Sequence, residues 1–167
     1  GLMTAITCIL APLSIPLPFS PVPISLTNLV IFISVFILGM KDATISFLIY
    51  LLLGAVGLPV FASFHAGLSV LAGPTGGYLI GFIFLALIQG FAMKYFDRKL
   101  IPTIIGMLIG MAVCYIFGTV WLAKLMSLSF KEGLFMGVIP YLPGDAVKII
   151  IAVIVGPKLY AATKKVR

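Results

Sequence analysis

Long apolar stretches fill almost the whole chain, and short charged or Pro/Gly-rich breaks separate them. The apolar residues run continuously instead of alternating, which favours membrane-spanning helices over a β-barrel. We therefore predict an all-α polytopic membrane protein with six transmembrane helices in a single membrane domain, 1–167. The approximate helices cover residues 1–14, 25–39, 43–56, 77–93, 101–123 and 143–160.

Two of the breaks between these helices are long enough to carry structure of their own. The first, residues 14–23, holds four prolines at near-alternate positions, which excludes a helix and favours an extended conformation. It carries no charge, so at membrane depth it must lie against protein or a cavity. The second is a long loop, 57–75, which contains the only histidine.

Composition supports a membrane protein and excludes several other classes. Hydrophobic residues make up 62% of the 167 residues and charged residues only 9%, too few for the surface of a soluble domain. The apolar content excludes a disordered chain, and two cysteines inside apolar runs exclude a disulfide scaffold. The net charge of +7 comes from short clusters between apolar runs, which indicates contact with membrane lipid and no nucleic-acid binding.

The distribution of basic residues predicts the orientation in the membrane. With six spans, eight of the eleven Lys and Arg residues fall on the side of the termini, and two fall on the opposite side. Positive charge is enriched in cytoplasmic loops, so we expect a multi-pass protein of the cell membrane with both termini cytoplasmic. The proline-rich segment and the loop 57–75 then lie outside the cell.

Asp145 and Lys148 are the two charged residues near the start of the last apolar segment. Ionisable residues inside a membrane are costly and are candidates for function. A spacing of three places both on one helical face, where they offer carboxylate acceptors and ammonium donors to a small molecule. The alternative is an ion pair that only fixes the helix to its neighbours.

Other motifs point to binding more than to catalysis. The glycines of Gly73-Pro-Thr-Gly-Gly-Tyr78 allow the backbone to approach a ligand closely, although a tight turn would need them too. The sequence has no Gly-x-x-x-x-Gly-Lys-Ser/Thr motif, so we do not expect the chain to hydrolyse ATP. His65 has no partners at metal-ligand spacing, and Gly-x-Ser-x-Gly is absent, which disfavours a metal site or a serine hydrolase.

Four motifs taken together resemble the BioY family, the biotin-specific S components of energy-coupling factor (ECF) transporters. The resemblance runs in order along essentially the whole chain. It implies the S-component bundle and a biotin pocket that opens outward in a prokaryotic cell membrane. It further implies a transmembrane T subunit and two ABC ATPase subunits as partners, with ATP bound only by those ATPases and no cofactor on this chain. The motifs are SIPLPFSPVPI (14–24), GAVGLPVF (54–61), GPTGGYLIGF (73–82) and LPGDAVK (142–148).

The resemblance also implies roles for individual residues. Asp145 would accept hydrogen bonds from the ureido N–H groups of biotin, and Lys148 would donate to an oxygen. S components carry a small-residue pattern on the first helix for docking to the T subunit, and here its counterpart is Thr7 and Ala11. The expected biotin-binding residues are Asp145, Lys148, Gly73, Pro74, Thr75, Tyr78, Ser63, Phe61 and Phe64.

Three alternatives stay open at this point. The chain could be an S component for a different vitamin, such as thiamine or riboflavin. It could be a membrane-embedded enzyme, a protease or a lipid-modifying protein. It could also be a structural membrane subunit in which Asp145 and Lys148 serve packing alone.

Overall fold

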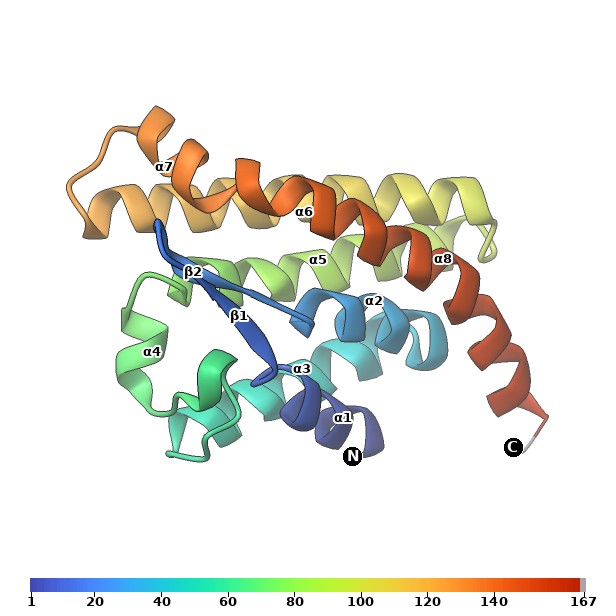
Figure 1. Cartoon of the computed structure of the whole chain (residues 1–167). Helices are drawn as coiled ribbons and strands as arrows, with labels where there is room; N and C mark the ends of the chain where they lie inside the picture. Colours follow the sequence, from blue (N-terminus) through green and yellow to red (C-terminus); the bar gives the residue numbers. More distant parts are fainter. Residues whose placement is uncertain (166–167) are drawn as a thin grey trace.

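The computed structural model describes residues 1–165 and shows a bundle of helices with a small β-hairpin across one end (Figure 1). Two short 3-10 turns, η1 and η2, precede α4 and α8. The elements in chain order are α1 (Leu2–Leu10), β1 (Ser14–Leu17), β2 (Ser20–Ser25), α2 (Thr27–Leu38), α3 (Met40–Ala55), η1 (Ala62–Phe64), α4 (Leu68–Ala72), α5 (Gly76–Tyr95), α6 (Leu100–Leu125), α7 (Phe130–Gly137), η2 (Ile139–Tyr141) and α8 (Leu142–Lys164).

Three helical stretches within residues 1–165 are long and apolar enough to cross a membrane, namely 76–95, 100–125 and 130–164. Their outward faces are apolar: Ile105 and Leu108 on α6 and Ile150 and Ile154 on α8 are each at least half exposed. Hydrocarbon can solvate such faces, while the helices satisfy their own backbone groups. The helical membrane bundle is thus confirmed, and the count of six spans stays a prediction.

Helices α5 and α6 form the most extensive pair, and glycines line the seam between them. A Cβ atom at Gly81 would meet Cys114, and one at Gly110 would meet Leu85 across the interface. Small residues let two membrane helices approach closely, so van der Waals contact holds the pair together. Gly81 and Gly110 therefore serve helix packing here.

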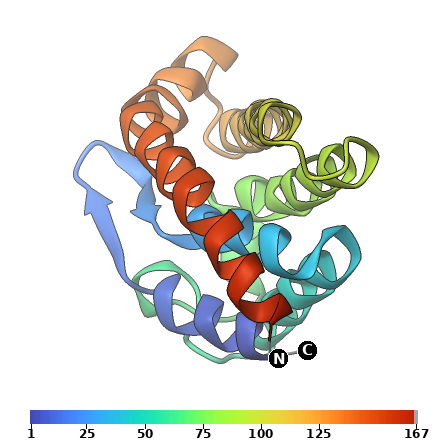
Figure 2. The same cartoon turned by 90° about the vertical axis from the view of Figure 1, so that its right-hand side faces the viewer.

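The proline-rich segment forms the antiparallel hairpin β1–β2, which lies beside α8 in the second view (Figure 2). Ser14 pairs with Ser25 and Leu17 with Ser20, and the register shifts between Ile15 and Leu17. Pro16 sits at that irregularity, and a proline has no N–H to donate to the ladder. The extended conformation expected for residues 14–23 is confirmed, and its pairing into a hairpin is new information from the structure.

Two other regions differ in detail from the boundaries expected from the sequence. Helix α1 ends at Leu10 instead of residue 14, because Pro12 cannot supply the N–H that would continue it. The expected loop 57–75 contains η1 and the five-residue helix α4. The hairpin, α4 and α7 gather at one end of the bundle, opposite the α5–α6 turn and the end of α8 (Figure 1).

Candidate functional site

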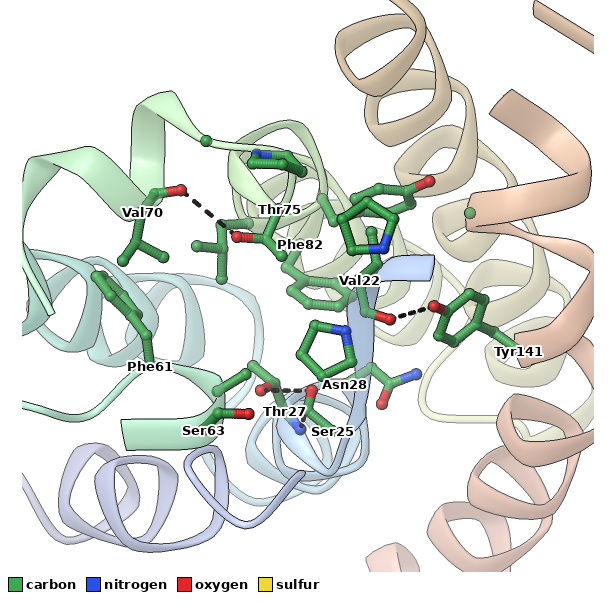
Figure 3. A pocket seen from close by; sticks show the side chains of 18 of the residues that line it. Val22, Ser25, Thr27, Asn28, Phe61, Ser63, Val70, Thr75, Phe82 and Tyr141 are labelled. Atoms are coloured by element: carbon green, nitrogen blue, oxygen red, sulfur yellow. Dashed lines mark hydrogen bonds between the residues drawn. The ribbon is translucent and has the colours of Figure 1, made fainter. Parts of the chain in front are cut away.

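A cavity of about 460 Å³ lies at the hairpin end of the bundle. Residues from β1, β2, α2, α3, the η1–α4 segment, α5, α6, α7, η2 and α8 line it, so every helix and strand except α1 contributes to its walls. Its size falls in the range of roughly 300–1,000 Å³ that is typical of small-molecule sites. Figure 3 shows rings and aliphatic chains facing polar groups across this space.

Asp145 and Lys148 occupy the first two turns of α8 and line the cavity. Their spacing places them on one face, and Lys148 Nζ lies 2.8 Å from Asp145 Oδ1. Both residues are buried, with 7% and 8% of their surfaces exposed. A buried ion pair needs further hydrogen bonds to offset the loss of hydration, and neighbouring elements supply them.

Two residues that the sequence analysis did not select complete this polar cluster. Asn28 at the start of α2 donates to Asp145 Oδ1 at 2.7 Å, and Tyr115 on α6 donates to Asp145 Oδ2 at 2.5 Å. Lys148 Nζ also donates to the carbonyl of Ser25 at 2.7 Å. Asn28 is the only asparagine in the chain and lies inside an apolar segment, which is the sequence signal that could have identified it.

The cluster retains hydrogen-bonding capacity toward the cavity. An ionised carboxylate accepts at about four lone-pair positions, and three donors reach Asp145. An ammonium group has three N–H bonds, and Lys148 uses two of them, on Asp145 and Ser25. One acceptor position on Asp145 Oδ2 and one donor on Lys148 are therefore available to a ligand.

Apolar and aromatic side chains form the rest of the wall. Phe61 is 1% exposed and packs edge-on against Tyr50, with ring centroids 5.6 Å apart. Phe82 and Met111 also line the cavity. Of the two phenylalanines expected to bind biotin, Phe61 lines the cavity, whereas Phe64 is 63% exposed and is not among the lining residues.

The side chains of Ser63 and Phe64 point in different directions, because both residues adopt left-handed backbone conformations, with φ of 57° and 60°. Ser63 lines the cavity, but its polar atoms are engaged with the hairpin. Its backbone N–H donates to Ser14 Oγ at 2.8 Å, and the two hydroxyls lie 3.0 Å apart. His65 lines the exposed rim, with Nδ1 2.9 Å from the carbonyl of Ala62.

The glycine-rich motif forms a further part of the cavity wall, where Gly73, Pro74, Thr75 and Tyr78 all line the space. The carbonyl of Gly73 accepts a 2.9 Å hydrogen bond from Trp121 Nε1, which fixes this turn to α6. The Thr75 hydroxyl lies 3.4 Å from the carbonyl of Val70, toward α4 (Figure 3). The motif is therefore held on two sides and faces the cavity between them.

The structure does not place the expected docking pair on the surface. Thr7 is 3% exposed and donates to the carbonyl of Met3 at 2.8 Å, and Ala11 is fully buried in the core. The outward face of α1 instead carries Leu2, Ala5 and Ile9. The small residues at positions 7 and 11 therefore pack α1 against its own bundle.

The sequence and the overall fold are similar to those of known proteins. The sequence matches the BioY family over residues 1–165. It is 34% identical to the probable biotin transporter BioY of Pyrococcus horikoshii, covering 98% of this chain and 94% of that protein. It is 35% identical to the biotin transporter BioY of Thermotoga maritima, covering 95% and 92%. A crystal structure of the S-component for biotin from an ECF-type ABC transporter superposes with a TM-score of 0.87 at 32% identity, covering 95% and 86%.

Proposed function

Because this chain belongs to the BioY family, we propose that it is an S component that binds biotin in the cavity between the hairpin and α8. The relatives named above are transporters, so the chain belongs among transport proteins and not among enzymes. Its task is to capture the vitamin on the outer side of the membrane and present it to partner subunits that drive import.

The observation that carries the proposal is the match between the polar cluster and the ureido group. A ureido group presents two N–H donors flanking one carbonyl acceptor. Asp145 Oδ2 has an acceptor position for an N–H, and Lys148 has a donor for the carbonyl. The apolar wall of Phe61, Phe82 and Met111 suits the thioether ring and the aliphatic chain.

The charge distribution supports an outward-facing cavity. Basic residues concentrate at the end of the bundle that holds the α5–α6 turn and the end of α8, away from the cavity (Figure 1). By the positive-inside rule that end faces the cytoplasm, together with both termini. Arg167, one of the eight basic residues counted on this side, lies outside the described residues.

Energy for import comes from other chains in this proposal. The sequence has no phosphate-binding loop, so ATP binds to two ABC ATPase subunits that act through a transmembrane T subunit. No cofactor takes part, and no cluster of three metal-ligating residues occurs within residues 1–165. The surface that meets the T subunit would have to differ from the buried pair Thr7 and Ala11.

The test is thermal unfolding of the detergent-purified chain with biotin from nanomolar to micromolar concentrations. A ligand at 100 times its Kd should add about 2.7 kcal/mol to the free energy of unfolding. We expect a saturable shift with biotin and none with thiamine or riboflavin. A shift with another vitamin alone would mean that this vitamin, and not biotin, is the substrate. No shift with any ligand would favour a structural subunit.

Variants of the polar cluster locate the site. Asp145→Asn and Lys148→Ala should each weaken biotin binding by about 1–3 kcal/mol, because a buried partner loses its hydrogen bond. Lys158→Ala is the matched control, since this lysine lies on the same helix at its far, exposed end. Unchanged biotin affinity in both cluster variants would remove these residues from the site.

A further inference from the structure

Asn28 and Tyr115 approach the same carboxylate from two different helices, α2 and α6. We propose that these two residues set the ligand specificity of the site, so that it accepts a neutral cyclic urea and rejects a cyclic guanidinium. The proposal rests on biotin binding as the function of this cavity. It assigns Asn28 and Tyr115 a role that Asp145 and Lys148 cannot perform alone.

The first argument comes from counting donors and acceptors around Asp145. Asn28 Nδ2 and Lys148 Nζ fill Oδ1, and Tyr115 Oη donates to Oδ2. Asn28 Oδ1 accepts from the backbone N–H of Leu29 at 3.1 Å. Beside that amide oxygen, the groups still free are one acceptor position on Asp145, the phenolic oxygen of Tyr115 as an acceptor, and one N–H each on Asn28 and Lys148. A cyclic urea, with two N–H groups and one carbonyl, satisfies this set.

A cyclic guanidinium does not satisfy it. Replacing the carbonyl oxygen by a protonated imine removes the ligand's acceptor and adds two more N–H donors. The free N–H groups of Lys148 and Asn28 would then face donors, which leaves polar groups buried without partners. Such unpartnered groups cause strong discrimination between ligands of nearly the same shape.

The second argument is the charge of the cavity. Among residues 1–165, Asp145 and Lys148 are the only Asp, Glu, Lys or Arg side chains that line it, and they form a salt bridge at 2.8 Å. The cluster therefore has no net charge to offer a cation. The attraction of the Asp145 carboxylate for a guanidinium is offset by the repulsion from the Lys148 ammonium, so nothing compensates the hydration that a cation loses in this buried site.

Asn28 keeps the cluster neutral because its side chain is an uncharged amide and not a carboxylic acid. The Asp145 carboxylate can only accept, so the amide nitrogen of Asn28 must face it. An aspartate at position 28 would place a second carboxyl group against Asp145, and in its ionised form it would add a negative charge and acceptor positions beside the ligand. The change exchanges one oxygen for one nitrogen and leaves the shape of the side chain almost the same, which makes Asn28→Asp a sharp test.

The experiment measures Kd at pH 7 for biotin and for its cyclic guanidine analogue, which keeps the bicycle and the aliphatic acid. The wild-type chain should prefer biotin. In Asn28→Asp the ratio of the two Kd values should move toward the guanidine on the order of tenfold or more. Asn28→Leu removes the donor without adding charge, so it should weaken biotin without improving the guanidine.

Two further variants separate this role from general effects. Tyr115→Phe removes the neutral phenolic acceptor and frees a second, charged acceptor position on Asp145 Oδ2, so it should shift the ratio in the same direction by a smaller factor. Ser127→Asp adds the same negative charge on the exposed loop between α6 and α7, outside the lining of the cavity, and should leave the ratio close to wild type. If Asn28→Asp does not fold, Tyr115→Phe still tests the proposal.

The outcomes distinguish this inference from the proposed function. A ratio unchanged in both Asn28→Asp and Tyr115→Phe, with biotin still bound, would overturn the specificity role and leave biotin capture intact. Equal shifts in Ser127→Asp and Asn28→Asp would overturn it too, because any negative charge would then suffice. A folded wild-type chain that binds neither compound would overturn the proposed function itself.

Discussion

Tyr141 and Ser20 lie 121 positions apart in the sequence, and the Tyr141 hydroxyl donates a 2.8 Å hydrogen bond to Ser20 Oγ. The same hydroxyl contacts the carbonyl of Val22, as the dashed line in Figure 3 marks. Tyr141 ends the turn before α8, so it ties the hairpin to the helix that carries Asp145 and Lys148. The hairpin forms one wall of the cavity, and this contact holds that wall closed.

Tyr141→Phe should therefore speed the dissociation of biotin several-fold, because the ring stays in place while both hairpin contacts are lost. The free energy of unfolding should fall by about 1 kcal/mol, the usual effect of one hydrogen bond. Stopped-flow release of a fluorescent biotin derivative measures the rate. Ser20→Ala removes one of the two contacts and should have a smaller effect, and wild-type release from Tyr141→Phe would show that the contact does not hold the wall.

Glycines at positions 118 and 137 create the slot that holds the ring of Tyr78. A Cβ at Gly118 would meet carbons of that ring, and a Cβ at Gly137 would meet its hydroxyl. Gly118→Ala and Gly137→Ala should each lower the free energy of unfolding by about 1–3 kcal/mol through overpacking. Gly144→Ala is the control, since no atom lies within 4 Å of a Cβ there. That variant should be as stable as wild type or slightly more stable. Equal unfolding temperatures for all three variants would show that Gly118 and Gly137 are not needed to make room for Tyr78.

Much of the fold could be predicted from the sequence, because helices in the hydrocarbon of a membrane need long apolar stretches. Long apolar stretches marked the helices, and prolines marked the extended segment. The resemblance to the BioY family is confirmed by the match over residues 1–165. The pairing of the hairpin and the helix α4 were missed, because prolines weaken a strand pattern and five residues are too few to show helical periodicity.

The site was found in part, for a physical reason. Asp145 and Lys148 stand out because charge in an apolar segment is costly. Asn28 and Tyr115 are neutral, and they meet Asp145 only because α2 and α6 pack beside α8. No spacing in the sequence reveals such long-range contacts. Phe64 was expected to bind biotin from the resemblance to the family, but the left-handed turn at Ser63 and Phe64 leaves its side chain exposed.

Arg98 joins three elements at the end of the bundle opposite the cavity. Its Nη1 donates to the carbonyl of Phe36 at 2.7 Å, and its guanidinium lies 3.8 Å from the ring centroid of Tyr160. Arg98→Ala should lower the free energy of unfolding by about 1–3 kcal/mol, because it removes both the hydrogen bond from the charged guanidinium and the cation–π contact. Lys99→Ala, which removes an exposed charge next to it, is the control in thermal unfolding. Equal stability of the two variants would show that Arg98 does not brace α2 and α8.

Ser14 and Ser63 offer a way to lock the hairpin against the η1 loop. Their hydroxyl oxygens lie 3.0 Å apart, and a disulfide joins two sulfurs at about 2.05 Å with only a small shift of the side chains. We expect the oxidised Ser14→Cys/Ser63→Cys variant to bind and release biotin more slowly than wild type, because the cross-link fixes the hairpin to the η1 loop at the wall of the cavity. Reduction should restore both rates.

The single variants Ser14→Cys and Ser63→Cys, treated with the same oxidant, control for reaction at the two native cysteines. Cys114 is fully buried and Cys8 is partly buried, so both should react slowly. Mass spectrometry gives the cross-linked fraction, and the biotin association and dissociation rates are measured on that fraction. Wild-type rates in a fully cross-linked chain would mean that biotin passes without movement of the hairpin. Slow rates that recover on reduction would identify the hairpin as the moving wall, with Ser63 as its attachment point on the η1 loop.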